Sequence, residues 1–300
     1  MCREEGYRLG EAISVGNLGV LHVQAGRREE AREHYERHLE LAREVGFRQA
    51  EAIATGNLGG LDYIAGRFAS ALLRHERMLR LSTEIGFRMG EASAMAGLGL
   101  VLGALGRRAE ARGWQERRLA LVRELRRPDQ EGEALLWLGD FALDEGDRPE
   151  AERRYREALA LWEAVGYRPG IGAVRGCLGA MCRESSRPEE AAEHLAAALA
   201  AARDTDAAGA LVAASIEWAL LRPEGVQAAL DAYAEKEPRL SHLERTHARF
   251  RLFRLTGDAA QLKEARRLLA ELRDGAPEGD RARMVELVPL YRDILAAEPR

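Results

Sequence analysis

The sequence predicts an all-α protein, built as a solenoid of antiparallel helix–turn–helix repeats. The strongest observation is a pattern that returns every 40 residues. Leu18-Gly19 recurs at this spacing as Leu58-Gly59, Leu98-Gly99, Leu138-Gly139 and Leu178-Gly179. Two further observations agree with it: glycines interrupt each unit at fixed places, and apolar residues between them follow helical spacing. Self-similarity at such a period is typical of stacked helical repeats.

Each unit is predicted to contain two helices. Helix A runs from about residue 8 to 25 and helix B from about residue 28 to 45, and both recur 40 residues later. Gly26 separates the two helices. A stripe with helical spacing marks the buried face of helix B: Ala31, Tyr35, His38, Leu39 and Leu41.

The joints between units follow their own pattern. Gly46 stands where a helix end needs positive φ, which glycine adopts without a Cβ clash. Phe47 follows and is expected to fold back onto the last turn of helix B, and Tyr7, Phe87 and Tyr167 take the same position. Gly19 and its equivalents lie inside helix A, where glycine costs about 1 kcal/mol relative to alanine. We expect them to allow close approach of helix B at Ala31.

Five units are predicted over residues 1–204, followed by degenerate helical repeats and a capping helix over residues 205–300. The last part is expected to contain helices near 207–221, 226–235, 240–255 and 259–272, and one closing helix over 281–297. Degenerate terminal repeats cover the last apolar face of a solenoid. The chain begins directly on a helix A, so we expect it to be a fragment, or the C-terminal part, of a longer protein.

This pattern resembles the tetratricopeptide repeat family. The resemblance rests on Leu18-Gly19, Gly26, Ala31 and Leu39 at the spacing of the family, and it covers about residues 1–204. It implies a right-handed superhelix in which helix A lines a concave groove. The 40-residue period is similar to that of a narrower group, which includes spindle-orientation adaptors and bacterial signalling proteins. In that group an Arg and an Asn of helix A grip a peptide; only the Asn matches here, at Asn17 and Asn57.

The resemblance also implies which side chains line the groove. The residues singled out as partner-binding are Asn17, Val20, Asn57, Tyr63, Leu100, Trp137, Asp140 and Arg183. In the last two units the groove positions are Leu136, Asp140, Leu143, Gly176, Ala180 and Arg183. The groove is therefore apolar in its first three units and carries charge only in the last two, which suits an apolar helix or strand of a partner more than a charged tail. The alternative occupant is another part of the parent chain. Trp137 fits either the groove or the core.

Composition narrows the class of partner. The net charge is −4, from 45 basic and 49 acidic residues, and glutamates accompany almost every arginine pair. This balance indicates an ion-paired surface and neither a nucleic-acid nor a membrane partner. The longest uncharged run, residues 92–106, is shorter than the about 20 residues that span a bilayer. With three cysteines and no apolar leader, a cytoplasmic location is expected.

The residue pattern argues against catalysis and against cofactors. Glu30, His34 and His38 lie four residues apart and could share a metal ion, but no further ligand of matching geometry accompanies them. Cys177 and Cys182 are interpreted as packing residues. No nucleotide-binding loop fits its required context. We therefore expect neither an enzyme nor a metal or cofactor site.

Two functions remain from the sequence. The leading hypothesis is a protein-interaction scaffold or adaptor that binds a peptide or helix of a partner in the concave groove. The alternative keeps the fold and makes the repeats the sensor or regulatory arm of a larger bacterial signalling protein, with a kinase, cyclase or ATPase-type regulator attached. The oligomeric state is not predicted.

Overall fold

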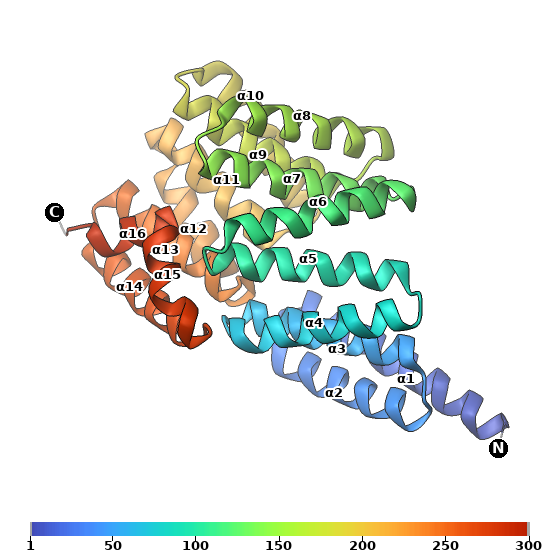
Figure 1. Cartoon of the computed structure of the whole chain (residues 1–300). Helices are drawn as coiled ribbons and strands as arrows, with labels where there is room; N and C mark the ends of the chain where they lie inside the picture. The colour runs from blue at the N-terminus through green and yellow to red at the C-terminus, as the bar shows by residue number, and fades with distance from the viewer. Residues whose placement is uncertain (1, 299–300) are drawn as a thin grey trace. The chain divides into compact units, whose positions relative to one another are not determined.

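The computed structural model describes the backbone of residues 2–298 and the side chains of residue 8 and residues 10–298. All regular elements in this part of the chain are helical. The predicted all-α fold of antiparallel helical repeats is confirmed (Figure 1). The predictions for Cys2 and Tyr7 lie outside the described side chains.

The helices form two compact units. The first contains residues 1–114 and 272–284, and the second contains residues 115–271 and 285–300. The predicted boundary at residue 204 separates the regular repeats from the degenerate ones, which is a different division from these two units. It remains a prediction.

The first unit contains the first two and a half repeats. Its helices are α1 (Cys2–Gln24), α2 (Arg28–Glu44), α3 (Arg48–Ile64), α4 (Phe68–Glu84), α5 (Arg88–Ala104) and the beginning of α6 (Arg108–Glu124). From α3 to α6, each helix is 17 residues long and starts 20 residues after the one before it. The 40-residue period in the sequence is therefore the length of one helical hairpin.

The second unit continues the same pattern and then departs from it. Its regular helices are α7 (Pro128–Asp144), α8 (Arg148–Val165), α9 (Arg168–Glu184) and α10 (Pro188–Asp204). The later helices are α11 (Ala208–Leu221), α12 (Val226–Lys236), α13 (His242–Thr256), α14 (Ala259–Asp274), α15 (Arg281–Leu287) and α16 (Pro289–Ala296). Short 3-10 turns occupy Pro223–Gly225, Glu237–Arg239 and Glu278–Asp280. α14 and α15 each extend across the boundary between the units.

The predicted single closing helix over residues 281–297 is wrong, because the structure has two helices there. α15 ends at Leu287, α16 begins at Pro289, and Val288 between them has φ −84° and ψ 114°. A residue that precedes proline is pushed out of the helical region by the proline ring. Pro289 therefore starts a new helix.

Gly46 ends helix α2 in the conformation that the sequence predicts. Its φ is +67°, the amide of Phe47 donates to the carbonyl of Ala42 at 2.8 Å, and that of Gly46 donates to Arg43 at 3.2 Å. These two bonds satisfy carbonyls that the helix end leaves open. The same left-handed conformation recurs at equivalent joints without glycine, at Arg126 with φ +54° and Asp206 with φ +49°.

The glycines inside the first helices do allow close approach, but the contact partner differs from the predicted Ala31. A Cβ on Gly19 would collide with the ring of Tyr35, and one on Gly139 would collide with the ring of Tyr155. The reason is that a large residue on helix B, four positions after the small alanine, points at the glycine. The glycine thus makes room for a ring rather than for a second small residue.

Within the first unit, the segment 272–284 packs on the repeats. The amide of Ala69 donates to the carbonyl of Gly275 at 3.0 Å, and Arg107 pairs with Asp280 at 3.5 Å. A Cβ on Gly275 would collide with the carbonyl of Gly66 in the α3–α4 turn. This contact joins residues about 200 positions apart in the chain and needs a glycine on one side.

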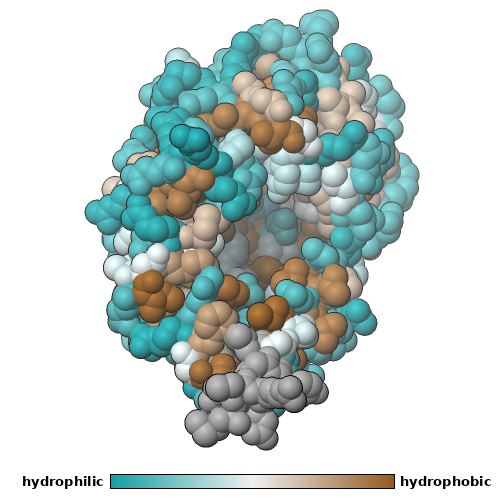
Figure 2. Space-filling view, turned by 90° about the vertical axis from the view of Figure 1, so that its right-hand side faces the viewer, coloured by the Kyte–Doolittle hydropathy of each residue, from teal (hydrophilic) through white to brown (hydrophobic). Residues whose placement is uncertain are grey.

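Figure 2 shows one face of the molecule on which hydrophilic residues predominate and apolar residues gather only in small patches. Among residues 2–298, none of the helices combines the length and the apolar character that crossing a membrane requires.

Candidate functional site

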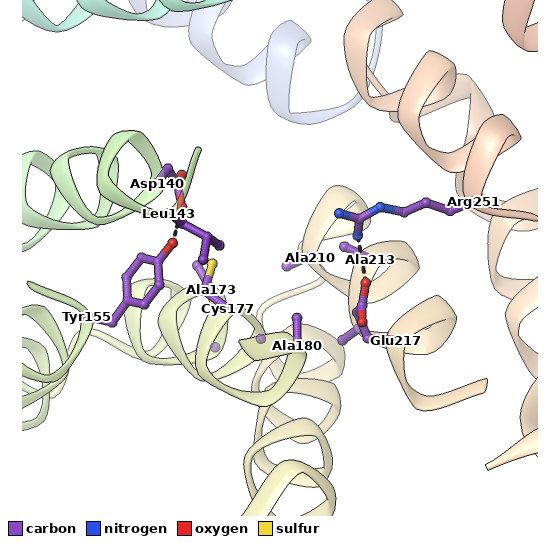
Figure 3. A pocket seen from close by; sticks show the side chains of 13 residues that line it. Asp140, Leu143, Tyr155, Ala173, Cys177, Ala180, Ala210, Ala213, Glu217 and Arg251 are labelled. Carbon is purple, nitrogen blue, oxygen red and sulfur yellow. Dashed lines mark hydrogen bonds and ion pairs between the residues drawn. The ribbon is translucent and has the colours of Figure 1, made fainter. Parts of the chain in front are cut away.

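A pocket of about 200 Å³ lies in the second unit, against the first helices of successive hairpins. Its walls come from α7, α9 and α11, and α8 and α13 add one side chain each, Tyr155 and Arg251 (Figure 3). Most of the wall consists of small residues: Gly172, Ala173, Gly176, Ala180, Ala210, Ala213 and Ala214. Asp140 and Tyr155 stand on one side, and Glu217 and Arg251 on the other.

The small wall follows from the sequence of α9. Gly172, Gly176 and Ala180 are spaced by four residues, so they share one helix face. A Cβ on Gly172 would lie 2.9 Å from that of Ala201, so this glycine lets α10 pack closely. Gly176 is different, because a Cβ there would have only the Cβ of Ala198, at 4.0 Å, for a neighbour. Among the described residues, no core side chain therefore fills the hollow at Gly176.

Asp140 is the acidic group on the α7 side of the pocket. It accepts a hydrogen bond from the hydroxyl of Tyr155 at 2.6 Å. Burial raises the pKa of Asp140 to about 7, against the lowering effect of the Tyr155 bond, and the nearby charge of Asp144 adds to the rise. Near neutral pH this carboxyl therefore exists in both protonation states. Burial also raises the pKa of the Cys177 thiol in the same wall well above its usual value.

Glu217 is the acidic group on the side of the pocket opposite Asp140. Its side chain is buried, and its two oxygens accept separately, from Arg183 on α9 and from Arg251 on α13, each at 2.9 Å. A buried carboxylate needs such partners to offset the loss of hydration. Glu217 thus joins three helices and fixes the guanidinium of Arg251 at the edge of the pocket (Figure 3).

A second cavity of about 460 Å³ adjoins the pocket and shares Glu217 and Arg251 with it. We call it the arginine basin, defined by Arg148, Arg183, Arg251, Arg254, Glu184, Glu217, Leu220, Phe250 and Leu290. Arg148 pairs with Glu184 at 3.0 Å. Four arginines against two glutamates leave the basin positively charged.

Family models settle what kind of repeat carries this site. A model described as Tetratricopeptide repeat matches residues 10–84 and 130–204, and a second one of the same description matches residues 92–126. The chain belongs to the tetratricopeptide repeat family. A comparison with the curated proteins finds no match.

Several solved structures have the same fold. A Rap protein complexed with Competence and Sporulation Factor has a TM-score of 0.71 at 14% identity, covering 95% of this chain and 76% of its own. The Rap conjugation gene regulator of plasmid pLS20, in complex with the Phr* peptide, has a TM-score of 0.72 at 13% identity, with 96% and 79% covered. Aspartyl phosphate phosphatase F from Bacillus subtilis has a TM-score of 0.68 at 11% identity, with 91% and 72% covered. These likenesses concern the fold.

The structure does not bring all of the predicted groove residues together in one cavity. Asp140 lines the pocket, together with Leu143, Gly176 and Ala180, and Arg183 lines the arginine basin. Trp137, one turn before Asp140, is partly exposed and lies outside both cavities.

The remaining predicted groove residues belong to the first unit. Asn17 and Val20 are exposed, whereas Asn57, Tyr63 and Leu100 are partly buried. The ring of Tyr63 packs on Phe68 with 5.8 Å between centroids. Their role as a partner-binding surface therefore stays a prediction.

Sequence reasoning missed two charged residues of the site, Glu217 and Arg251. Cys177, which the sequence indicates as a packing residue, does pack against the core of the second unit, and it also lines the pocket. Glu217 and Arg251 lie in the degenerate repeats, where the register is lost. A glutamate inside the otherwise apolar run of α11 was the one available signal.

The histidine series on α2 has local partners. The ring of His34 bonds to the carbonyl of Glu30 at 2.7 Å and packs on His22, whereas His38 is buried. Burial lowers the pKa of His38. Within the described residues, there is no group of three or more His, Cys, Asp or Glu residues that could hold a metal ion.

Proposed function

We propose that this protein is a regulatory scaffold that binds a short peptide segment of a partner in the pocket formed by α7, α9 and α11. The observation that carries the proposal is the pocket itself, which has small walls on the first helices of successive repeats and polar groups on opposite sides. Ligand sites combine a mainly apolar concave surface with a few fixed polar groups. The volume of about 200 Å³ suits one or two side chains of a peptide whose backbone lies across the helices.

The solved structures with the same fold support a peptide as the occupant. One of them is a gene regulator in complex with the Phr* peptide, and another is a Rap protein in complex with Competence and Sporulation Factor. At 13% and 14% identity these structures establish fold and not ligand. They nevertheless make peptide binding the first function to test on this chain.

The polar groups of the pocket favour binding over catalysis. A thiol acts as a nucleophile only as thiolate, and burial raises the pKa of the Cys177 thiol. Burial likewise raises the pKa of the Tyr155 hydroxyl, which already donates to Asp140. We therefore propose a non-catalytic protein of the cytoplasm, with a peptide or protein partner and neither nucleic acid nor membrane.

The alternative function uses the same pocket. In it, the repeats are the sensor arm of a larger signalling protein, and peptide binding changes the activity of an attached domain. The regulatory names of the solved structures favour this alternative over a purely structural scaffold. Both functions require a peptide to enter the pocket, so one experiment tests their common step.

That experiment is a selection of random octapeptides displayed on phage, followed by measurement of the enriched peptides by fluorescence anisotropy. Ala213 lines the pocket and is exposed, so Ala213→Trp fills the cavity without disturbing the core. Ala200→Trp on the exposed side of α10 is the matched control. We expect the pocket variant to weaken binding at least about tenfold, as loss of a central contact does. Equal binding by both variants would exclude this pocket.

A further inference from the structure

We propose that the arginine basin binds carboxylates of the partner peptide, so that the site selects an acidic segment next to the side chains held in the pocket. This inference rests on the proposed function, because it names the chemistry of the same partner. The ligand class is a peptide with two or more neighbouring carboxylates, from glutamate, aspartate or the C-terminus.

The charges of the basin are only partly matched inside the protein. Each oxygen of Glu217 is already used, one by Arg183 and one by Arg251. Glu184 accepts from Arg148 at 3.0 Å and lies 3.5 Å from Arg183. Among the described residues, Arg254 has neither a hydrogen-bond nor an ion-pair partner. Two positive charges thus remain for a ligand.

The unmatched donors converge from three helices. Arg148 begins α8, Arg183 lies in the last turn of α9, and Arg251 and Arg254 lie nearly one turn apart on α13. A guanidinium presents five N–H donors, and one carboxylate oxygen occupies only one or two of them. Arg183 and Arg251 therefore keep donors after binding Glu217, which also fixes their positions. Preorganised guanidinium groups suit bidentate binding of carboxylates.

The basin and the pocket lie next to one another. They share Glu217 and Arg251, so a chain lying across α9 and α11 passes from the pocket into the basin. The pocket side holds Asp140, whereas the basin is positive, so the site has opposite polarity at its two ends. A peptide with its carboxylates on the basin side fits this polarity, and the reverse orientation places like charges together.

The first test uses a carboxylate without a peptide. Glutarate is titrated into the full chain labelled with nitrogen-15 at arginine, and the Nε–H resonances are followed by NMR. Arg148→Ala/Arg254→Ala lowers the charge of the basin and leaves both partners of Glu217 in place. Arg153→Ala/Arg156→Ala on α8 changes the net charge equally outside both cavities. We expect saturable shifts that give an affinity for glutarate. The basin variant should weaken this affinity at least about tenfold, and the control variant at most about twofold. Absence of shifts, or equal weakening by both variants, overturns the proposal.

The second test separates this inference from the proposed function. Two octapeptide pools are compared by fluorescence anisotropy, with the last three positions fixed as glutamate in one and as glutamine in the other. We expect the glutamate pool to bind at least about tenfold more tightly at low salt, and the advantage to vanish in Arg148→Ala/Arg254→Ala and to shrink in high salt. Binding of both pools with equal affinity overturns the carboxylate inference and leaves peptide binding intact. If glutarate binds the basin and neither pool binds, the proposed function fails and the carboxylate site stands.

Discussion

The hydroxyl of Tyr155 donates a hydrogen bond to the carboxyl of Asp140 across 2.6 Å. The bond joins α8 to α7 beside the pocket, and Tyr155 is completely buried. Among the described residues, no cation pairs with Asp140, which faces the pocket, whereas two arginines pair with Glu217. Burial raises the pKa of Asp140 to about 7. The carboxyl of Asp140 therefore changes its protonation state between pH 5 and pH 8.

The raised pKa predicts a pH-dependent effect of Asp140→Asn on stability. The folded state holds the proton up to about pH 7, whereas the unfolded state loses it near pH 4. The contribution of Asp140 is therefore fully present below the unfolded pKa and is lost as pH rises through the folded pKa. Asparagine keeps an acceptor for Tyr155 and has no charge to bury. We expect the free energy of unfolding of the variant, relative to wild type, to rise by about 1–3 kcal/mol between pH 5 and pH 8.

Urea denaturation at several pH values measures this effect. Asp231→Asn on α12 is the control, because Asp231 is exposed and does not line the pocket. A parallel pH dependence in wild type and Asp140→Asn would show that the carboxyl of Asp140 titrates normally.

Substitution by alanine is expected to have opposite effects on stability at two glycines of the first helices, Gly139 and Gly60. Gly139→Ala places a Cβ against the ring of Tyr155. Because overpacking moves side chains off their preferred rotamers, we expect a loss of about 1–3 kcal/mol. Gly60→Ala on α3 has no atom within 4 Å of its new Cβ and is expected to gain up to about 1 kcal/mol from helix propensity.

Chemical denaturation of the two variants compares these effects directly. Because Tyr155 carries the bond to Asp140, Gly139→Ala should also change the tyrosine environment in the near-ultraviolet circular dichroism spectrum. Similar stabilities for the two variants would contradict the close contact of Gly139 with Tyr155.

The sequence could predict the repeats because each unit repeats the same local constraint. Gly46 and its equivalents, with their positive φ, mark the ends of the second helices, so helix boundaries follow within a few residues. The register also placed Asp140 and Arg183 on the first helices, where the structure has its cavities. Periodicity states which helix face a residue takes, whereas the partner-binding role of both residues stays a prediction.

The rest of the site depends on contacts that have no periodic signal. Arg251 meets Glu217 from a helix 34 residues further along the chain, outside the 40-residue register. The space at Gly176 exists because α10 presents only Ala198 there. Trp137 fits either the groove or the core by its spacing, and the structure leaves it partly exposed, one turn before the pocket residue Asp140. Neither spacing nor composition contains such information about distant neighbours.

The left-handed conformation of Arg126, at a joint that lacks glycine, predicts that substitution by glycine stabilises the protein. Its φ of +54° lies in the left-handed region, where a Cβ clashes with the backbone. Arg126→Gly should raise the free energy of unfolding by up to about 1 kcal/mol, and Gly46→Ala, at the equivalent joint with φ +67°, should lower it by a similar amount. Thermal unfolding monitored by circular dichroism measures both. The prediction fails if Arg126→Gly lowers the melting temperature, which would mean that contacts of the arginine side chain outweigh backbone strain.

The close approach at Gly275 predicts that adding one methyl group there loosens the contact between segment 272–284 and the α3–α4 turn. A Cβ at this position would collide with the backbone carbonyl of Gly66, which cannot move as a flexible side chain can. Gly275→Ala should therefore weaken the bond from the Ala69 amide to the Gly275 carbonyl, at a cost of about 1–3 kcal/mol to local stability. Hydrogen exchange at the Ala69 amide measures this local opening. Gly279→Ala lies in the same segment with no atom within 4 Å of its new Cβ, so exchange at Ala69 should stay at the wild-type rate. Equal protection of Ala69 in both variants would show that the segment does not depend on the close approach at Gly275.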